Sequence, residues 1–207
     1  LQILDVSNPA AVTRLGGYDT AAYSYDLQVV GSVAYIADDY GGLLVLDVSD
    51  PAAVAILGGS GPSAFGVHVV GDLAYVAGHL GLSVFNISRP AGVTRLGGYD
   101  TYVDAEDLHV VGNLAYVAGD SKGLQILNVS NPDAVTRAGE YDTPGDALAV
   151  QVVGNLAYVA DNYYGLQVLD VSDPAAVIKL GGYNTLGQAL DVQVVGNLAY
   201  VADNYYG

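Results

Sequence analysis

Short apolar runs alternate with turn residues along the whole chain. Ala189–Gly196 is apolar and β-branched and leads into a Gly-Asn pair, and Leu198–Ala202 is a second apolar run. The same alternation continues at the start of the chain, in Leu1–Val6 and Val12–Leu15. Apolar runs of this length, separated by Gly, Asn, Asp and Pro, predict four short strands of an antiparallel meander. The Ser-Asn-Pro and Ser-Asp-Pro segments before the fourth run predict a single helical turn.

This pattern occurs five times. A segment of the type Asp/Asn-Val/Ile-Ser-x-Pro recurs at intervals of 42, 39, 42 and 42 residues, starting at Asp5, Asp47, Asn86, Asn128 and Asp170. A second marker, Gly-x-Val/Leu-Ala-Tyr, recurs with it, starting at Gly31, Gly71, Gly112, Gly154 and Gly196. Four strands in a period of about 40 residues are typical of a propeller blade.

The two ends of the chain complete each other. The final segment Asp203–Gly207 repeats Asp161–Gly165, and the opening residues Leu-Gln-Ile-Leu-Asp resemble those that follow Gly165. The last 25 and the first 17 residues therefore make one further unit of 42. A linear solenoid usually has atypical capping repeats at its ends, whereas a unit divided between the two ends indicates a closed ring.

Strands this apolar need cover on both faces, and sheets packed radially around an axis provide it. We therefore predict an all-β fold, a five-bladed β-propeller with four antiparallel strands per blade, formed as one domain by residues 1–207. In this prediction the fifth blade is closed by the C-terminal and N-terminal strands together. The predicted blades are approximately residues 18–59, 60–98, 99–140, 141–182, and 183–207 together with 1–17.

The repeated segments resemble a known family. Gly165–Pro174 reads Gly-Leu-Gln-Val-Leu-Asp-Val-Ser-Asp-Pro, with variants in every unit, and together with Gly154–Asp161 it resembles the LVIVD repeat. The resemblance implies a β-propeller of bacterial and archaeal extracytoplasmic and cell-surface proteins, and it brings no shared catalytic motif. An extracellular or cell-surface location is expected from it, although no signal peptide is visible at Leu1. The second unit departs from the pattern, because it is three residues shorter and reads Asn-Ile-Ser-Arg-Pro.

Composition and charge exclude several classes of protein. The 22 Asp and Glu residues against 6 Lys and Arg give a net charge of −16, which excludes nucleic acid as a partner because no basic surface can be built. The absence of Cys excludes disulfides and thiol chemistry. No apolar run is long enough to span a membrane as a helix. No nucleophile elbow and no phosphate-binding loop is present, so we expect no enzymatic activity.

Sequence variation between units gathers at one end of the predicted blades, in the loops between blades and in the turns between second and third strands. Variable loops on a rigid scaffold are where binding residues usually lie. The candidate ligand-face residues are Tyr23, Tyr25, Asp26, Asp38, Asp39, Tyr40, Tyr102, Asp104, Glu106, Asp107, Asp146, Tyr163, Tyr164, Asp191, Tyr205 and Tyr206.

The first strand of each unit is expected to line a central channel. One polar position in this strand is occupied by Gln28, His68, His109, Gln151 and Gln193. These side chains are expected to hydrogen-bond one another and trapped water, as buried polar groups must. Asp26, Asp107 and Asp191 lie two positions earlier and are weak candidates for a Ca²⁺ site, since the equivalent Gly66 and Ala149 offer no oxygen ligand. No other metal and no other cofactor is expected.

We expect a non-enzymatic extracytoplasmic binding or scaffold module that presents an acidic, Tyr-rich face to a protein or glycan partner. One alternative is a structural subunit that assembles with copies of itself into a filament or lattice. Another is a lectin-like or Ca²⁺-binding propeller. Asn86 and Asn128 match the N-glycosylation sequon, although both belong to the repeat's own Asp/Asn-Val/Ile-Ser segment.

Overall fold

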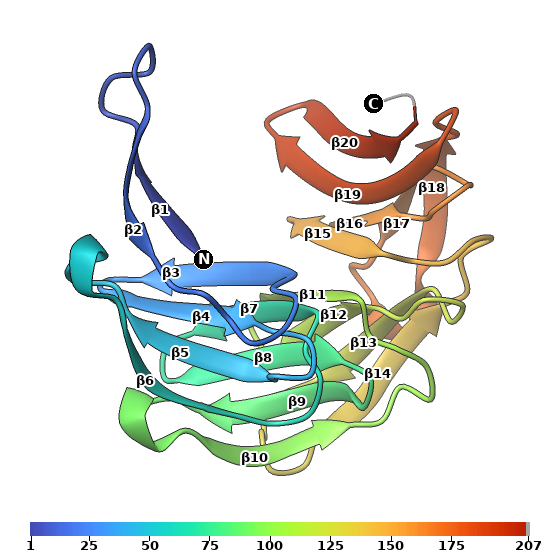
Figure 1. The fold of residues 1–207 in the computed structure, drawn as a ribbon. Coiled ribbons are helices and arrows are strands. Elements are labelled where there is room, and N and C mark those ends of the chain that lie inside the picture. Colours follow the sequence, from blue (N-terminus) through green and yellow to red (C-terminus); the bar gives the residue numbers. More distant parts are fainter. Residues whose placement is uncertain (206–207) are drawn as a thin grey trace.

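The computed structural model describes residues 1–205 as a series of antiparallel sheets (Figure 1). Sheet 1 contains β3 (Asp26–Val30), β4 (Val33–Ala37), β5 (Leu43–Asp47) and β6 (Ala55–Ser60), and sheet 2 contains β7 (Gly66–Val70), β8 (Leu73–Gly78), β9 (Gly81–Asn86) and β10 (Thr94–Tyr99). Sheet 3 contains β11 (Asp107–Val111), β12 (Leu114–Ala118), β13 (Leu124–Asn128) and β14 (Thr136–Tyr141), and sheet 4 contains β15 (Ala149–Val153), β16 (Leu156–Ala160), β17 (Leu166–Asp170) and β18 (Ile178–Tyr183). The predicted all-β class and the predicted four-stranded meanders are confirmed.

Two further hairpins lie at the ends of the series. The N-terminal hairpin consists of β1 (Gln2–Asp5) and β2 (Thr13–Gly17), and the C-terminal hairpin consists of β19 (Gln188–Val195) and β20 (Leu198–Asn204). The predicted helical turns form at three of the proline segments, as η1 (Pro51–Ala53), η2 (Pro90–Gly92) and η3 (Pro174–Ala176). Asp50 and Asp173 cap two of these turns, since each carboxylate accepts the backbone N–H two residues ahead.

The Asp/Asn-Val/Ile-Ser segments form a repeated side-chain turn. The Asp47 carboxylate accepts the backbone N–H of Ser49 at 2.9 Å, and the Asn86 side-chain oxygen accepts that of Ser88 at 2.9 Å. The Ser49 hydroxyl and amide also hold the pKa of Asp47 below its ordinary value. Asn128 makes the same bond, so this local turn accounts for the residues that form the two sequons.

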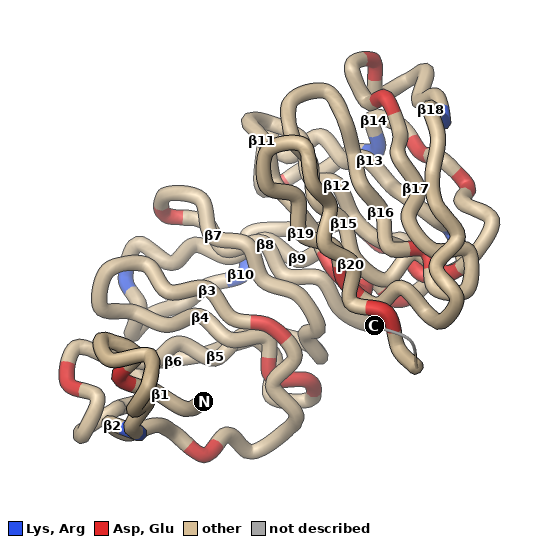
Figure 2. Tube along the Cα trace, turned by 90° about the horizontal axis from the view of Figure 1, so that it is seen from above, with Lys and Arg blue, Asp and Glu red and all other residues tan. Residues whose placement is uncertain are grey.

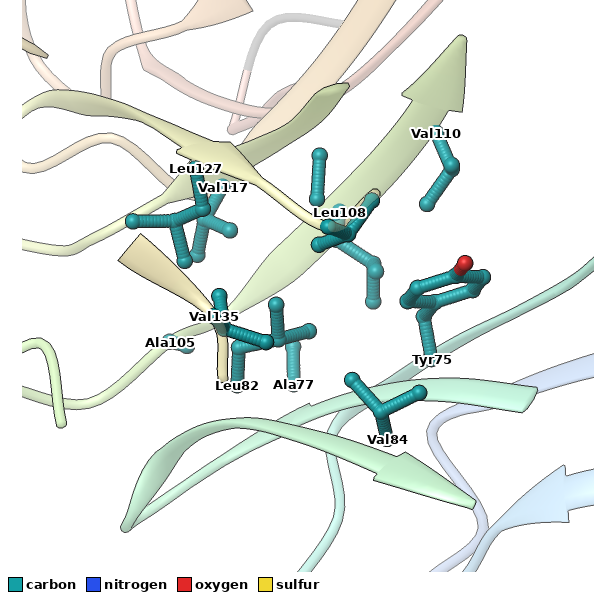
Figure 3. Packing of buried hydrophobic residues seen from close by; sticks show 12 residues of the cluster. Tyr75, Ala77, Leu82, Val84, Ala105, Leu108, Val110, Val117, Leu127 and Val135 are labelled. Atoms are coloured by element: carbon teal, nitrogen blue, oxygen red, sulfur yellow. The ribbon is translucent and has the colours of Figure 1, made fainter. Parts of the chain in front are cut away.

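Apolar side chains bury the faces between neighbouring sheets. Figure 3 shows one such layer, in which Tyr75 and Leu82 of sheet 2 pack with Leu108 and Leu127 of sheet 3. Equivalent clusters lie between sheets 1 and 2 and between sheets 3 and 4. Each sheet therefore depends on its neighbour for cover, as the apolar character of the strands predicts.

The outer strands touch the following sheet through glycine. A Cβ added at Gly139 of β14 would lie 1.7 Å from the carbonyl oxygen of Pro174 in the next sheet. Gly16, Gly58 and Gly97 approach the neighbouring proline loops in the same way. The close approach requires glycine at this position, because any side chain would displace the neighbouring loop.

The predicted closure of the fifth blade is absent from the described residues. β1 pairs only with β2 and β20 pairs only with β19, so the two hairpins remain separate two-stranded sheets. Figure 1 shows them at opposite ends of the series. The sequence pattern determines which strands have matching edges, but the packing angle between successive sheets determines whether the two ends meet. Leu4 and Leu198 consequently remain exposed.

We predict that Leu127→Ala lowers the free energy of unfolding by about 2–5 kcal/mol, because Leu127 is fully buried between sheets 2 and 3. Denaturant unfolding followed by circular dichroism measures the change. Leu80→Ala, in an exposed turn, is the control and should change stability by less than about 0.5 kcal/mol. Equal effects of the two substitutions would contradict the described packing.

Candidate functional site

The two ends of the sheets differ in structure. At one end, the turn between second and third strands bonds to the loop that enters the next sheet, through the backbone bridges Asp39–Ala64, Asp120–Ala147 and Asn162–Ala189. We call this end the loop face. The opposite end, the turn face, carries the Gly-containing hairpin turns and the proline segments. Acidic residues occur mainly at these strand ends (Figure 2).

Most of the tyrosines predicted for the ligand face are exposed on the loop face. These exposed residues are Tyr23, Tyr25, Tyr40, Tyr102, Tyr163, Tyr164 and Tyr205. Tyr206 lies outside the described residues. The loop face therefore carries aromatic rings contributed by loops along the whole series of sheets and by the C-terminal hairpin.

Asp38 and Asp39 are buried, although the sequence placed them among the candidate ligand-face residues. They are only 2% and 6% exposed, because their carboxylates hold loops in place. Asp38 accepts the Ser24 hydroxyl at 2.8 Å, and Asp39 accepts the Ser63 hydroxyl at 2.8 Å. Polar residues in a turn between apolar strands look like surface groups in a sequence, and only the fold shows that a neighbouring loop covers them.

The polar ring of the innermost strands connects each sheet to the next. The Val110 backbone N–H donates to His68 Nδ1 at 2.8 Å, and the Val152 N–H donates to His109 Nδ1 at 2.8 Å. The Val69 N–H donates to Gln28 Oε1, and the Val194 N–H donates to Gln151 Oε1. The ring side chains therefore bond the adjacent backbone rather than one another, which corrects the sequence-based expectation. Gln193, on the last innermost strand, is exposed.

Carboxylates extend this connection toward the loop face. Asp26 Oδ2 accepts the Val67 N–H at 2.8 Å, and Asp107 Oδ2 accepts the Val150 N–H at 2.9 Å. Asp191 accepts only the neighbouring Val192 N–H among the described residues. Two of the three carboxylates thus have a structural role between sheets.

A cavity of about 460 Å³ opens where these carboxylates meet the loop face. Asp26, Asp107 and Asp191 all line it, together with Glu106, Tyr25, Phe65, Leu148, Ala149 and Leu190. Burial raises the pKa of Asp107 to about 7, and the charges of Asp26 and Asp191 act in the same direction. Burial also raises the pKa of Glu106, with Asp104 and Asp120 contributing. The lining of the cavity therefore has four acidic side chains and no lysine or arginine.

No group of three or more His, Asp or Glu side chains within residues 1–205 lies close enough to hold a metal ion. The three carboxylates share the cavity without converging on one point. Within the same range, no helix is long and apolar enough to cross a membrane.

Aromatic rings border the same cavity. Tyr25 meets Phe65 edge to face at 5.4 Å between ring centroids, and Phe65 meets His79 at 4.7 Å. His79 Nδ1 lies 2.9 Å from the carboxylate of Asp104. Phe65 and His79 lie in the variable loops but were not among the candidate ligand-face residues. The sequence could have indicated Phe65, because it occupies the position in its unit that Tyr25 and Glu106 occupy in theirs.

A larger groove, the Tyr groove, crosses the loop face between sheets 3 and 4. Its main cavity has a volume of about 650 Å³ and is lined by Tyr141, Asp142, Asp146, Asn162, Tyr163 and Tyr164, among others. A second cavity of about 280 Å³ shares Pro144 and Tyr164 with the first and adds Gln167, Lys179 and Tyr183. The sequence indicated Asp146, Tyr163 and Tyr164 but not that one groove joins them.

We predict that the histidine pair makes stability sensitive to acid. Burial and the stacked His109 ring lower the pKa of His68 to about 4, whereas an unfolded histidine titrates near 6.5. The contribution of His68 to the free energy of unfolding is therefore complete above pH 6.5 and is lost progressively as the pH falls toward 4. At pH 5 the loss is about 1 kcal/mol, allowing for partial exposure of the ring.

The double variant His68→Gln/His109→Gln tests this, because glutamine makes the same bond in sheets 1 and 4. It should melt like the parent at pH 7.5 and a few degrees higher at pH 5. Asp107, whose raised pKa acts in the opposite direction, is unchanged in both proteins. An equal acid-induced loss in parent and variant would show that the histidines are not responsible.

Solved structures with similar folds share little sequence with this chain. A functionally unknown protein from Desulfotomaculum acetoxidans DSM 771 is 18% identical, with a TM-score of 0.73 over 92% of this chain and 66% of that one. The computationally designed Ika8 protein is 10% identical, with a TM-score of 0.70 over 92% of this chain and 58% of that one. The designed Ika4 protein is 11% identical, with a TM-score of 0.61 over 77% of this chain and 99% of that one.

The chain thus spans about three fifths of the Ika8 protein and just under two thirds of the Desulfotomaculum protein. No curated protein matches it. The model of the LVIVD repeat matches six segments, residues 1–20, 21–59, 61–101, 104–143, 144–185 and 186–206. Because these matches extend over nearly the whole chain, the chain belongs to the LVIVD-repeat family.

Proposed function

We propose that the protein is a non-enzymatic binding module in which propeller blades present the loop face to a ligand outside the cytoplasm or at the cell surface. The observation that carries this proposal is the concentration of exposed tyrosines and carboxylates around two cavities on the loop face. The family likeness supports the location. Cavities lined by aromatic rings and a few polar groups are the usual form of binding sites.

The distribution of charge limits the ligands that this face accepts. Of the six cationic residues, Arg14, Arg95, Arg137 and Lys179 lie in the outermost strands β2, β10, β14 and β18, and Arg89 lies on the turn face. Lys122 lies in a loop-face turn, and Lys179 lines the smaller cavity of the Tyr groove, so acidic side chains outnumber cationic ones on this face. A surface of this kind repels anions and attracts cationic groups. The ligand is accordingly neutral or positively charged.

The finer form of the proposal is a five-bladed ring closed by β20 and β1. Three observations support it. The repeat register, with Val159 opposite Gln167 in sheet 4, places Val201 opposite Gln2. Gln193 and Asp191 are exposed on β19, the last innermost strand. In sheet 1 the equivalent Gln28 and Asp26 side chains accept hydrogen bonds from the innermost strand of the next sheet. Gly181, equivalent to Gly139, has no atom within 4 Å of the position that a Cβ would occupy, which leaves space for the proline loop of the N-terminal hairpin.

We predict that the effect of Gly181→Ala on stability shows whether β20 and β1 close the ring. In a closed ring its methyl group meets the Pro9 segment, as a Cβ at Gly139 meets Pro174, and both Gly181→Ala and Gly139→Ala lower the free energy of unfolding by about 1–3 kcal/mol. Thermal and denaturant melts measure both. A destabilising Gly139→Ala beside a neutral Gly181→Ala would count against closure within the chain.

We predict that penta-lysine binds the loop face and that dextran sulfate does not bind the protein. Asp104→Asn/Glu106→Gln should weaken penta-lysine binding several-fold in calorimetry at low salt, because the electrostatic attraction is reduced. Asp72→Asn/Asp133→Asn removes the same charge from the turn face and is the matched control. Equal weakening by both double variants, or binding of dextran sulfate, would refute an acidic ligand face.

A further inference from the structure

The Tyr groove combines exposed aromatic rings with an elongated cavity. Tyr163 and Tyr164 are 63% and 51% exposed and line the main cavity, and the exposed Tyr183 lines the adjoining one. Pro144 and Tyr164 belong to both cavities, so the groove continues past the Tyr164 ring. Exposed rings of this kind offer a flat apolar face beside a polar hydroxyl, which suits ligands that have both characters.

Unsatisfied hydrogen-bonding groups concentrate in the same groove. Within residues 1–205, the buried side-chain atoms that lack a hydrogen-bond partner are Thr143 Oγ1, Asp161 Oδ1, Asn162 Oδ1 and Gln167 Oε1. Thr143 and Gln167 are only 5% and 3% exposed, yet both line the groove's cavities. The Thr143 hydroxyl and the Asp161 carboxylate interact with each other, because Thr143 lowers the pKa of Asp161 through a side-chain hydrogen bond. Asn162 Oδ1 and Gln167 Oε1 are then the unpaired acceptors of residues that line the groove. Buried polar atoms are nearly always paired, so these two oxygens indicate a place where a partner binds.

The type of unpaired atom identifies what the partner must supply. Asn162 Oδ1 and Gln167 Oε1 are acceptors, so the ligand must donate hydrogen bonds. Asp161 lies directly behind Gly145, whose N–H it accepts at 3.1 Å through its other oxygen. Burial raises the pKa of Asp161, against the opposing effects of Thr143, Gly145 and Lys179. Hydroxyl groups are the donors that enter such a site without adding charge.

The region between sheets 2 and 3, which we call the control junction, differs from the Tyr groove between sheets 3 and 4. Between sheets 2 and 3, the equivalent Thr101 hydroxyl donates to the Val103 carbonyl at 2.6 Å, and the equivalent Gln125 donates to the Thr101 carbonyl at 3.2 Å. Ser121 and Lys122 replace the tyrosine pair in that turn. The junction between sheets 2 and 3 therefore lacks the tyrosine pair, and none of its described side-chain atoms is buried without a hydrogen-bond partner.

We infer that the Tyr groove binds a neutral saccharide. Sugar rings present C–H faces that stack on Tyr163 and Tyr164, and their hydroxyls donate to Asn162 and Gln167 at the groove floor. Asp142 and Asp146 line the groove and exclude sulfated or uronic acid chains by charge repulsion. This inference rests on the proposed binding role of the loop face and gives that face its ligand class.

The test is a glycan array that carries neutral glucans, mannans and galactans beside sialylated and sulfated chains, followed by calorimetry with the bound saccharide. We expect neutral saccharides to bind and anionic ones to be rejected. Tyr164→Ala should weaken binding at least tenfold, and Tyr163→Phe should preserve it because the ring remains. Leu80→Ala removes an exposed apolar side chain from the turn between β8 and β9, away from the groove, and should leave binding unchanged. Circular dichroism melts establish that each variant is folded.

Three results would overturn the inference: no neutral saccharide bound, binding insensitive to Tyr164→Ala, or equal loss in Leu80→Ala. Binding of penta-lysine through Asp104 and Glu106 without any saccharide binding would reject the saccharide and leave the proposed loop-face function standing. Failure of both probes would reject both proposals.

Discussion

The structure depends on hydrogen bonds that pass from an innermost strand to the backbone of the next sheet. One side chain of each of four innermost strands accepts an N–H from the innermost strand of the next sheet, and these side chains are Gln28, His68, His109 and Gln151. They occupy the same position in their repeat units. Asp26 and Asp107 add a second bond of the same direction. Because each sheet has apolar faces that only a neighbouring sheet can cover, these bonds fix the register at which the faces meet. The loop face is therefore assembled from adjacent sheets rather than from any single one.

This arrangement explains why both cavities lie at the ends of the strands. The backbone bridges from Asp120 to Ala147 and from Asn162 to Ala189 anchor loops whose tips remain free to vary. Rings such as Tyr164 then stand on a rigid base, next to carboxylates such as Asp142 and Asp146. Preorganised rings and acceptors lose little conformational entropy when a ligand binds. The acidic cavity lined by Asp26, Asp107 and Asp191 and the Tyr groove are two results of one scaffold.

Much of the fold could be predicted from the sequence, because the repeat period, the turn residues and the apolar runs are local signals. Polar positions such as His68 and Gln151 were also visible, since they recur at one place in each unit. Their partners were not, because a backbone N–H of the next sheet leaves no trace in residue identity. The burial of Asp38 and the unpaired oxygen of Gln167 likewise depend on which loop lies above them. The angle between successive sheets, which separates β1 from β20, is a sum of many packing contacts and has no sequence signature.

The free edges of β1 and β20 belong, on our proposal, to one blade. The chain has no Cys, so Gln2→Cys/Val201→Cys introduces a single pair of thiols at the positions that the repeat register places opposite each other. Such a disulfide forms only when the two Cα atoms lie within about 7 Å. Mild oxidation followed by non-reducing electrophoresis and mass spectrometry measures it. We expect an intramolecular disulfide in a monomer. Free thiols would contradict closure, and disulfide-linked dimers or longer ladders would show that the edges pair between copies instead.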